Sequence, residues 1–189
     1  MVRIPISISN RHIHLSEADA NTLFGTGYPF KEIKKLSQPG QFACEETLTI
    51  KGPKGEINGV RILWPFRKFT QVEILQSDTY KLGVQAPIRE SWDLEGSWAI
   101  TIKGPKGEIQ LNQGLIVAQR HIHLSVAEAK DFNLKNWQIV SVKTVGERAV
   151  IFENVIIRAG DAYALDMHLD MDEANAAALW AGARGEILA

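Results

Sequence analysis

The feature that most constrains this chain is a seven-residue segment that occurs twice. It reads Asn-Arg-His-Ile-His-Leu-Ser at residues 10–16 and Gln-Arg-His-Ile-His-Leu-Ser at residues 119–125. The similarity continues outside the segment, because the shift that carries His12 onto His121 also aligns residues 6–20 with residues 115–129. A repeat of this length predicts two related structural units in one chain.

Each copy contains a His-x-His pair, and the two pairs account for four of the five histidines. Alternate side chains of an extended strand lie on one face, so each pair directs two imidazoles to the same place. This arrangement is typical of a metal site. The structural alternative, in which the histidines only make local hydrogen bonds, is less favoured because core histidines seldom recur in spaced pairs. Ser16 and Ser125 are typical helix N-caps, so a short helix is expected after each strand.

The composition limits the class of protein. A chain of 189 residues with 45% hydrophobic residues is long enough for one good core or two small ones. The net charge of -1 offers no electrostatic basis for nucleic acid or an anionic membrane as a partner. No apolar run is long enough to span a bilayer and no secretory signal is visible, so we expect a soluble cytoplasmic protein. The single cysteine, Cys44, excludes an internal disulfide and is interpreted as a small core residue rather than a nucleophile.

Most of the chain consists of short alternating segments separated by turns. The segment 49–57, Thr-Ile-Lys-Gly-Pro-Lys-Gly-Glu-Ile, predicts a hairpin and recurs letter for letter at 101–109. Its lysines and glycines could cradle an anion, but the spacing is not that of a P-loop, so a solvated turn is the favoured interpretation. Short helices are expected at 16–24 and 172–179. Many short strands with few helices predict a mainly β fold with two barrels related by internal duplication and capped by helices.

A useful metal site needs at least a third ligand beyond each His-x-His pair. The fifth histidine, His168, lies in the alternating segment 166–170, 13 positions after Val155. In the first half Glu73 lies 13 positions after Val60, which places it at the equivalent strand position. The predicted triads are His12, His14 and Glu73, and His121, His123 and His168. Three protein ligands leave one coordination position open, as in catalytic zinc sites.

Four motifs together resemble one known family over residues 4 to about 182. They are the two histidine segments, Arg-Lys-Phe-Thr-Gln-Val-Glu at 67–73, and Asp-Met-His-Leu-Asp-Met-Asp-Glu-Ala-Asn at 166–175. With these motifs in this order the chain resembles the propanediol-utilisation type phosphotransacylases. The resemblance implies transfer of a short acyl group, propanoyl or acetyl, between coenzyme A and phosphate at a two-zinc site between two β-barrels.

The resemblance also implies domains and site residues. One discontinuous barrel would comprise residues 1–10 and 119–189, and the other residues 11–118. The two triads would bind zinc, and three residues would be catalytic: Arg67, Arg158 and Ser91. The two arginines would handle phosphate, because a planar guanidinium suits phosphate and keeps its charge at any working pH. Polar residues that would line the substrate pocket are Gln38, Gln41 and Gln71.

Two expectations concern the surroundings of the enzyme. We expect a homodimer. Many members of the family carry an N-terminal extension that directs them into a bacterial microcompartment, whereas only eleven residues precede His12 here. Cytoplasmic residence is therefore expected rather than the microcompartment lumen.

The expected mechanism is direct attack by phosphate on the thioester, with zinc stabilising the oxyanion and the departing thiolate. One alternative is a binuclear zinc hydrolase, which is disfavoured because the chain is short for a TIM barrel and because Leu15-Ser16 follows His14 where the β-lactamase-like hydrolases have Asp-His. A second alternative is a non-catalytic zinc-binding module, which the open triads and the two arginines disfavour.

Overall fold

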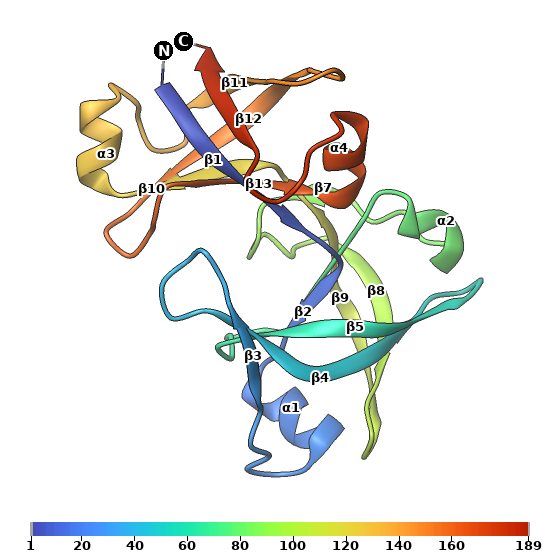
Figure 1. Ribbon diagram of the computed structural model, residues 1–189. Helices are drawn as coiled ribbons and strands as arrows, with labels where there is room; N and C mark the ends of the chain where they lie inside the picture. Colours follow the sequence, from blue (N-terminus) through green and yellow to red (C-terminus); the bar gives the residue numbers. More distant parts are fainter. Residues whose placement is uncertain (1, 189) are drawn as a thin grey trace. The chain divides into compact units, whose positions relative to one another are not determined.

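The computed structural model describes residues 2–188, and the chain forms two compact units (Figure 1). Unit 1 comprises Met1–Asn10, Ser37–Pro39 and Gln119–Ala189. Unit 2 comprises Arg11–Leu36 and Gly40–Ala118. Each unit is built around a closed six-stranded β-barrel with short helices, so the predicted mainly β fold with two barrels is confirmed.

The barrel of unit 2 is closed in the order β2-β6-β9-β8-β4-β5, with β5 pairing back to β2. Its strands are β2 (His12–His14), β4 (Phe42–Lys51), β5 (Glu56–Trp64), β6 (Gln71–Ile74), β8 (Trp98–Lys103) and β9 (Glu108–Ala118). Two further strands extend the sheet: β3 (Glu32–Lys35) pairs with β4, and β7 (Ile88–Arg89) pairs with β9. The helices of this unit are α1 (Glu17–Phe24) and α2 (Asp78–Leu82).

The barrel of unit 1 is closed in the order β1-β13-β10-β12-β11-β14. Its strands are β1 (Val2–Ser9), β10 (His121–Leu124), β11 (Ile139–Thr144), β12 (Ile151–Ala159), β13 (Asp166–Asp170) and β14 (Arg184–Leu188). The helices are α3 (Val126–Asp131) and α4 (Met171–Ala176).

The two barrels share one pairing pattern. Each histidine strand, β2 or β10, lies between a parallel neighbour, β5 or β12, and an antiparallel neighbour, β6 or β13. The strand paired in parallel with β6 is β9, and the strand paired in parallel with β13 is β1. The strand that precedes each histidine strand in the sequence therefore belongs to the other unit. Internal duplication is an interpretation of this pattern and of the sequence repeat.

Alternation along the strands separates core residues from site residues. Ile13 and Ile122, the middle residues of the two His-x-His pairs, are fully buried in the cores of their barrels. Val72 and Met167, on the strands that supply the third ligands, lie in the same two cores. Because successive side chains of a strand point to opposite faces, the histidines lie on the face away from the barrel interior.

The helices after the two histidine strands, α1 and α3, begin where the sequence predicted. The Ser16 side chain accepts a hydrogen bond from the Asp19 N–H, and Ser125 forms a complete capping box with Glu128. The prediction for 172–179 was wrong in its bounds, because α4 begins at Met171 after the N-cap Asp170 and ends at Ala176. Ala178 has a left-handed φ of 50°, and this reverses the chain. Among residues 2–188, no helix is long and apolar enough to cross a membrane.

The repeated Gly-Pro-Lys-Gly hairpins contact the ends of helices. Lys54 N–H donates to the Leu82 carbonyl at the end of α2, and Lys106 N–H donates to the Leu23 carbonyl in the last turn of α1, both at 3.0 Å. A Cβ atom at Gly104 would lie 2.7 Å from the Leu23 oxygen, and one at Gly52 would overlap the Leu82 oxygen. The glycines therefore allow close approach to helix backbones, and the turn is a docking element rather than only a solvated loop.

Candidate metal centres

The first triad is assembled where β2 pairs with β6. His12 lies opposite Glu73 and His14 lies opposite Gln71. This register places the Glu73 side chain on the same face as the two imidazoles. His12 Nε2 lies 3.3 Å from Glu73 Oε2, and candidate ligand atoms of His12, His14 and Glu73 all lie within 4.8 Å of one another. All three side chains are buried.

Two polar side chains orient the Glu73 carboxylate. Gln71 Nε2 donates to Glu73 Oε1 at 2.6 Å, and Ser91 Oγ donates to the same oxygen at 2.8 Å. The Trp92 N–H in turn donates to Gln71 Oε1 at 2.8 Å. Burial alone would raise the pKa of Glu73, but His12, His14 and the Ser91 hydroxyl outweigh it and hold the pKa well below its usual value. Glu73 is therefore a carboxylate whose other oxygen, Oε2, faces His12.

The second triad is assembled where β10 pairs with β13. His121 lies opposite His168, and His123 lies opposite Asp166. The three imidazole rings have centroids 4.6 to 5.0 Å apart, and the Nε2 atoms of His121 and His123 approach to 3.0 Å. His121 Nδ1 lies 2.8 Å from the Gln119 carbonyl, which can only accept, so the ring carries its hydrogen on Nδ1 and presents a lone pair on Nε2.

The local electrostatics lower the pKa of one histidine in each triad, His14 and His121. Burial lowers the pKa of His14 well below its usual value, and the neighbouring His12 and Arg67 lower it further. Burial likewise lowers the pKa of His121, with Arg158 as the next largest cause. Neutral imidazole is the form that binds metal ions.

An arginine accompanies each triad, and both were predicted as phosphate-handling residues. The Arg67 guanidinium lies 3.8 Å from the centre of the Trp92 ring, and its backbone N–H donates to the Leu15 carbonyl at 2.8 Å. Arg158 is buried and lies beside His123 in the parallel pairing of β10 with β12. Stacking and burial limit the side-chain freedom of the two arginines, which favours their use as fixed anion-binding groups.

The residues present fit a zinc ion in each triad. Imidazole nitrogens and a carboxylate oxygen are typical zinc donors, and each triad brings three of them together on one strand face. The hydrogen bond from His121 Nδ1 to a carbonyl is the usual outer contact of a metal-ligating histidine. Three protein donors leave a further coordination position for a substrate atom.

The other predicted pocket residues are placed differently. Both ends of the buried Gln38 amide are engaged, because Nε2 donates to the Ala164 carbonyl at 3.0 Å and Oε1 accepts from the Ala164 N–H at 3.2 Å. Gln41 is half-buried, and its carbonyl accepts from the Leu36 N–H at 3.0 Å. Of the four polar residues predicted for the site, Ser91 and Gln71 are thus brought to Glu73.

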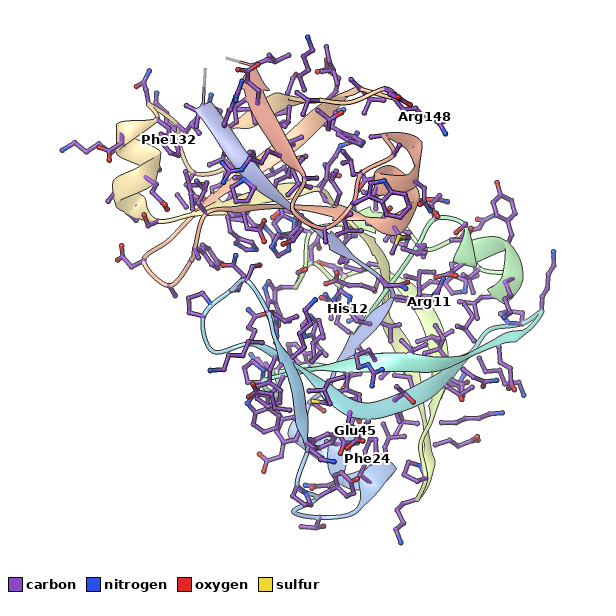
Figure 2. All side chains as sticks on the ribbon, viewed as in Figure 1. Arg11, His12, Phe24, Glu45, Phe132 and Arg148 are labelled. Carbon is purple, nitrogen blue, oxygen red and sulfur yellow. The ribbon has the colours of Figure 1, made fainter. Side chains whose placement is uncertain are left out.

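Two ion pairs near the triads were not predicted from the sequence. Arg11 Nε lies 2.7 Å from Asp78 Oδ2, and an Arg120 guanidinium nitrogen lies 2.8 Å from Glu173 Oε1. Figure 2 shows Arg11 next to His12 at the start of β2. Each pair connects the start of a histidine strand to a helix that follows the strand of the third ligand. Two signals in the sequence correspond to these pairs. The arginine recurs in both copies of the motif, and an acidic residue follows each third ligand by five positions, Asp78 after Glu73 and Glu173 after His168.

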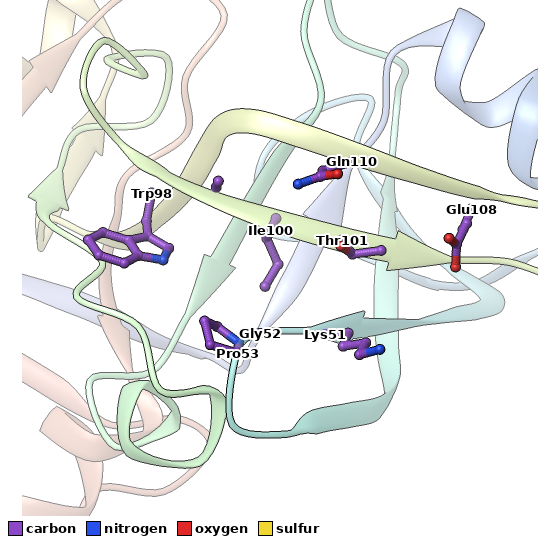
Figure 3. A pocket seen from close by; sticks show the side chains of 9 residues that line it. Lys51, Gly52, Pro53, Trp98, Ile100, Thr101, Glu108 and Gln110 are labelled. Carbon is purple, nitrogen blue, oxygen red and sulfur yellow. The ribbon is translucent and has the colours of Figure 1, made fainter.

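A surface hollow of about 340 Å³ in unit 2 is separate from the triads (Figure 3). It lies beside the first hairpin and is lined by residues that include Lys51, Trp98 and Glu108. None of the predicted site residues lines it. The candidate site is therefore defined by the triads and not by this hollow.

Comparison with known proteins agrees with the motifs. The family model for phosphate propanoyltransferase matches residues 5–180. The chain is 49% identical over 180 residues to the phosphate propanoyltransferase of Thermotoga maritima, which covers 95% of this chain and 86% of that protein. It is 46% identical to the enzyme of the same name from Clostridioides difficile, over 98% of this chain and 88% of that protein. With the two triads on a pair of β-barrels and this level of identity over nearly its full length, the chain belongs to the phosphate propanoyltransferase family.

Proposed function

We propose that this enzyme transfers a propanoyl or acetyl group between coenzyme A and inorganic phosphate at a site with two zinc ions, one in each triad. The observation that carries the proposal is that each triad of zinc-type donors has an arginine beside it, in a chain of this family. The donors suit a metal ion and the arginines suit phosphate. In this proposal the metal ions serve the acyl-CoA thioester, and the arginines bind the phosphate.

Arg67 and Arg158 bind and orient the phosphate in this proposal. A guanidinium can donate two parallel hydrogen bonds to phosphate oxygens, which fixes the direction in which a third oxygen points. The stacking of Arg67 on Trp92 limits the orientations available to its guanidinium. Holding phosphate in position for attack on the thioester carbon lowers the entropic part of the barrier.

The transfer proceeds by direct attack of a phosphate oxygen on the thioester carbonyl carbon. A carbon–oxygen bond forms, the carbon–sulfur bond breaks, and coenzyme A leaves as a thiolate. Bound zinc supplies Lewis acidity toward the thioester oxygen and the departing sulfur. A cysteine nucleophile is disfavoured, because Cys44 is fully buried and burial raises the pKa of its thiol to about 11.

Ser91 and Gln71 act through Glu73 in this proposal. Their hydrogen bonds to Oε1 leave Oε2 directed toward the metal position beside His12. Gln38 and Gln41 remain proposed substrate-pocket residues. The Gln38 amide hydrogen-bonds the backbone of Ala164, so in this role the side chain would line the pocket in a fixed orientation.

The decisive assay measures release of the coenzyme A thiol from propanoyl-CoA with and without phosphate, together with formation of propanoyl phosphate. A phosphate acyltransferase releases thiol only with phosphate and forms one acyl phosphate for each thiol. Thiol release without phosphate would instead indicate a zinc hydrolase, and no turnover under any condition would indicate a zinc-binding module.

A further inference from the structure

The strands that supply the third ligands, β6 and β13, each carry one carboxylate facing the histidine pair. In β6 it lies opposite the first histidine, and in β13 it lies opposite the second. In β6, Glu73 lies opposite the first histidine of its pair and Gln71 lies opposite the second. In β13, His168 lies opposite the first histidine and Asp166 lies opposite the second. The pattern is therefore Gln-x-Glu in one unit and Asp-x-His in the other, and each strand presents one carboxylate to its triad.

Asp166 is buried against the second triad. It is 2% exposed, and its Oδ2 lies 3.3 Å from His168 Nε2. Within the described residues, neither carboxylate oxygen of Asp166 nor His168 Nε2 makes a hydrogen bond of regular geometry.

A buried carboxylate is costly unless an opposite charge or hydrogen bonds compensate it. The ligands of the first triad include one negative charge, on Glu73, whereas those of the second triad are three histidines. A zinc ion in the second triad would provide the compensating charge for Asp166. Carboxylates that contact a metal-ligating histidine also fix its ring orientation and increase its basicity.

We propose that Asp166 supplies the carboxylate of the second metal centre, as a positioning residue that holds the His168 ring and balances the charge of the metal ion. The inference rests on the proposed zinc binding. It assigns to Asp166 the electrostatic role that Glu73 has in the first triad, but through a histidine rather than by direct contact with the metal. Each centre thus has one negatively charged side chain. In the first centre it is a ligand, and in the second it is a neighbour of a ligand.

The test uses a His12→Ala background of the full-length enzyme, in which only the second triad can hold zinc. Zinc affinity is measured by competition with a chromogenic chelator, and the site is also loaded with Co²⁺ and its visible absorption recorded. Asp166→Asn keeps the shape and removes the charge. It should weaken zinc roughly tenfold to a hundredfold and shift the Co²⁺ bands. The matched control Asp161→Asn changes an exposed carboxylate of the same unit and should alter neither quantity.

A double variant keeps the test decisive if Asp166→Asn disturbs folding. Asp166→Gln with His168→Glu copies the Gln71 and Glu73 pattern into β13. It should bind zinc more tightly than Asp166→Gln alone, because the His168→Glu change restores one carboxylate to the centre. A purely structural role for Asp166 predicts no such recovery.

The results separate this inference from the proposed function. If the enzyme without substitutions binds no zinc, the metal assignment of both triads is overturned, and this inference with it. If it binds two ions and Asp166→Asn leaves the affinity and the Co²⁺ spectrum of the second centre unchanged, only the role of Asp166 is overturned.

Discussion

His12 and Glu73 lie directly opposite each other in the antiparallel pair of β2 and β6, with Nε2 and Oε2 3.3 Å apart. In the other unit His121 lies opposite His168 in the same kind of pair. The third donor of each triad is thus placed by a strand register, so a change at this position should act on one metal ion at a time.

Glu73→Gln should therefore remove the zinc ion of the first triad and leave the second. The amide keeps the shape of the side chain but not the negative charge that favours the metal ion. Glu73→His should restore part of the binding by copying His168. Metal content after dialysis, determined by mass spectrometry, reports both effects, and two tightly held ions with full activity in Glu73→Gln would exclude Glu73 as a ligand.

Removal of zinc by a chelator should abolish acyl transfer, and added zinc should restore it. The enzyme should hold two ions for each chain, since each triad provides its own three donors. The measurement is zinc content in parallel with thiol release. Finding at most one ion after reconstitution would contradict the two-centre proposal.

Arg67→Ala and Arg158→Ala should raise the KM for phosphate and lower kcat, each by roughly tenfold to a hundredfold, because a charge-assisted contact is lost. Zinc content should not change. Arg148→Ala is the matched control, since Arg148 is an exposed arginine (Figure 2). If the KM for phosphate and kcat of both variants equalled those of Arg148→Ala, the two arginines would not bind phosphate.

Ser91→Ala should weaken zinc at the first triad by about three- to tenfold, because Glu73 loses one of the two hydrogen bonds that orient it. Ser141→Ala is the control, since Ser141 also donates to a glutamate, Glu153, but on the exposed surface. If Ser91→Ala changed turnover without any change in zinc affinity, Ser91 would act on substrate rather than on the ligand.

Cys44 should not react with a thiol reagent in the native enzyme near pH 8, and it should react after unfolding in urea. Burial raises the pKa of the thiol from 9.0 to about 11. A raised acid pKa means that the neutral thiol is favoured in the folded state, so its stabilising effect is present below pH 9 and is lost as the pH rises toward 11. Rapid labelling of the native protein, or loss of activity in Cys44→Ala with zinc retained, would reopen the case for a cysteine nucleophile.

Gly104→Ala should lower the free energy of unfolding by about 1–3 kcal/mol, because the new methyl group would lie 2.7 Å from the Leu23 carbonyl oxygen of α1. Lys106→Ala retains the backbone N–H that donates to Leu23 and should cost much less. Urea unfolding of both variants measures the difference, and equal stabilities would show that the hairpin does not need its close approach to the helix.

Local patterns in the sequence were sufficient to predict which side chains the two triads bring together. Strand alternation places His12 and His14 on one face, and equal spacing identified Glu73 as the counterpart of His168. The N-caps Ser16 and Ser125 were predicted equally well, because capping depends on contacts within one helical turn. The mainly β architecture followed from the same short-range alternation.

Long-range pairing, by contrast, was decided only by the tertiary structure. That β1 pairs with β13 and β9 pairs with β6 depends on contacts between segments far apart in the chain. The resemblance to a known family supplied the expected exchange of the first strand, which no local pattern contains. The sequence by itself determined which residues carry zinc-type donor atoms and on which strand face they lie. The contacts of Ser91 with Glu73 and of Asp166 with His168, and the docking of the hairpins on helix ends, required the fold. Hydrogen bonds and burial between distant segments leave no periodic signal in the sequence.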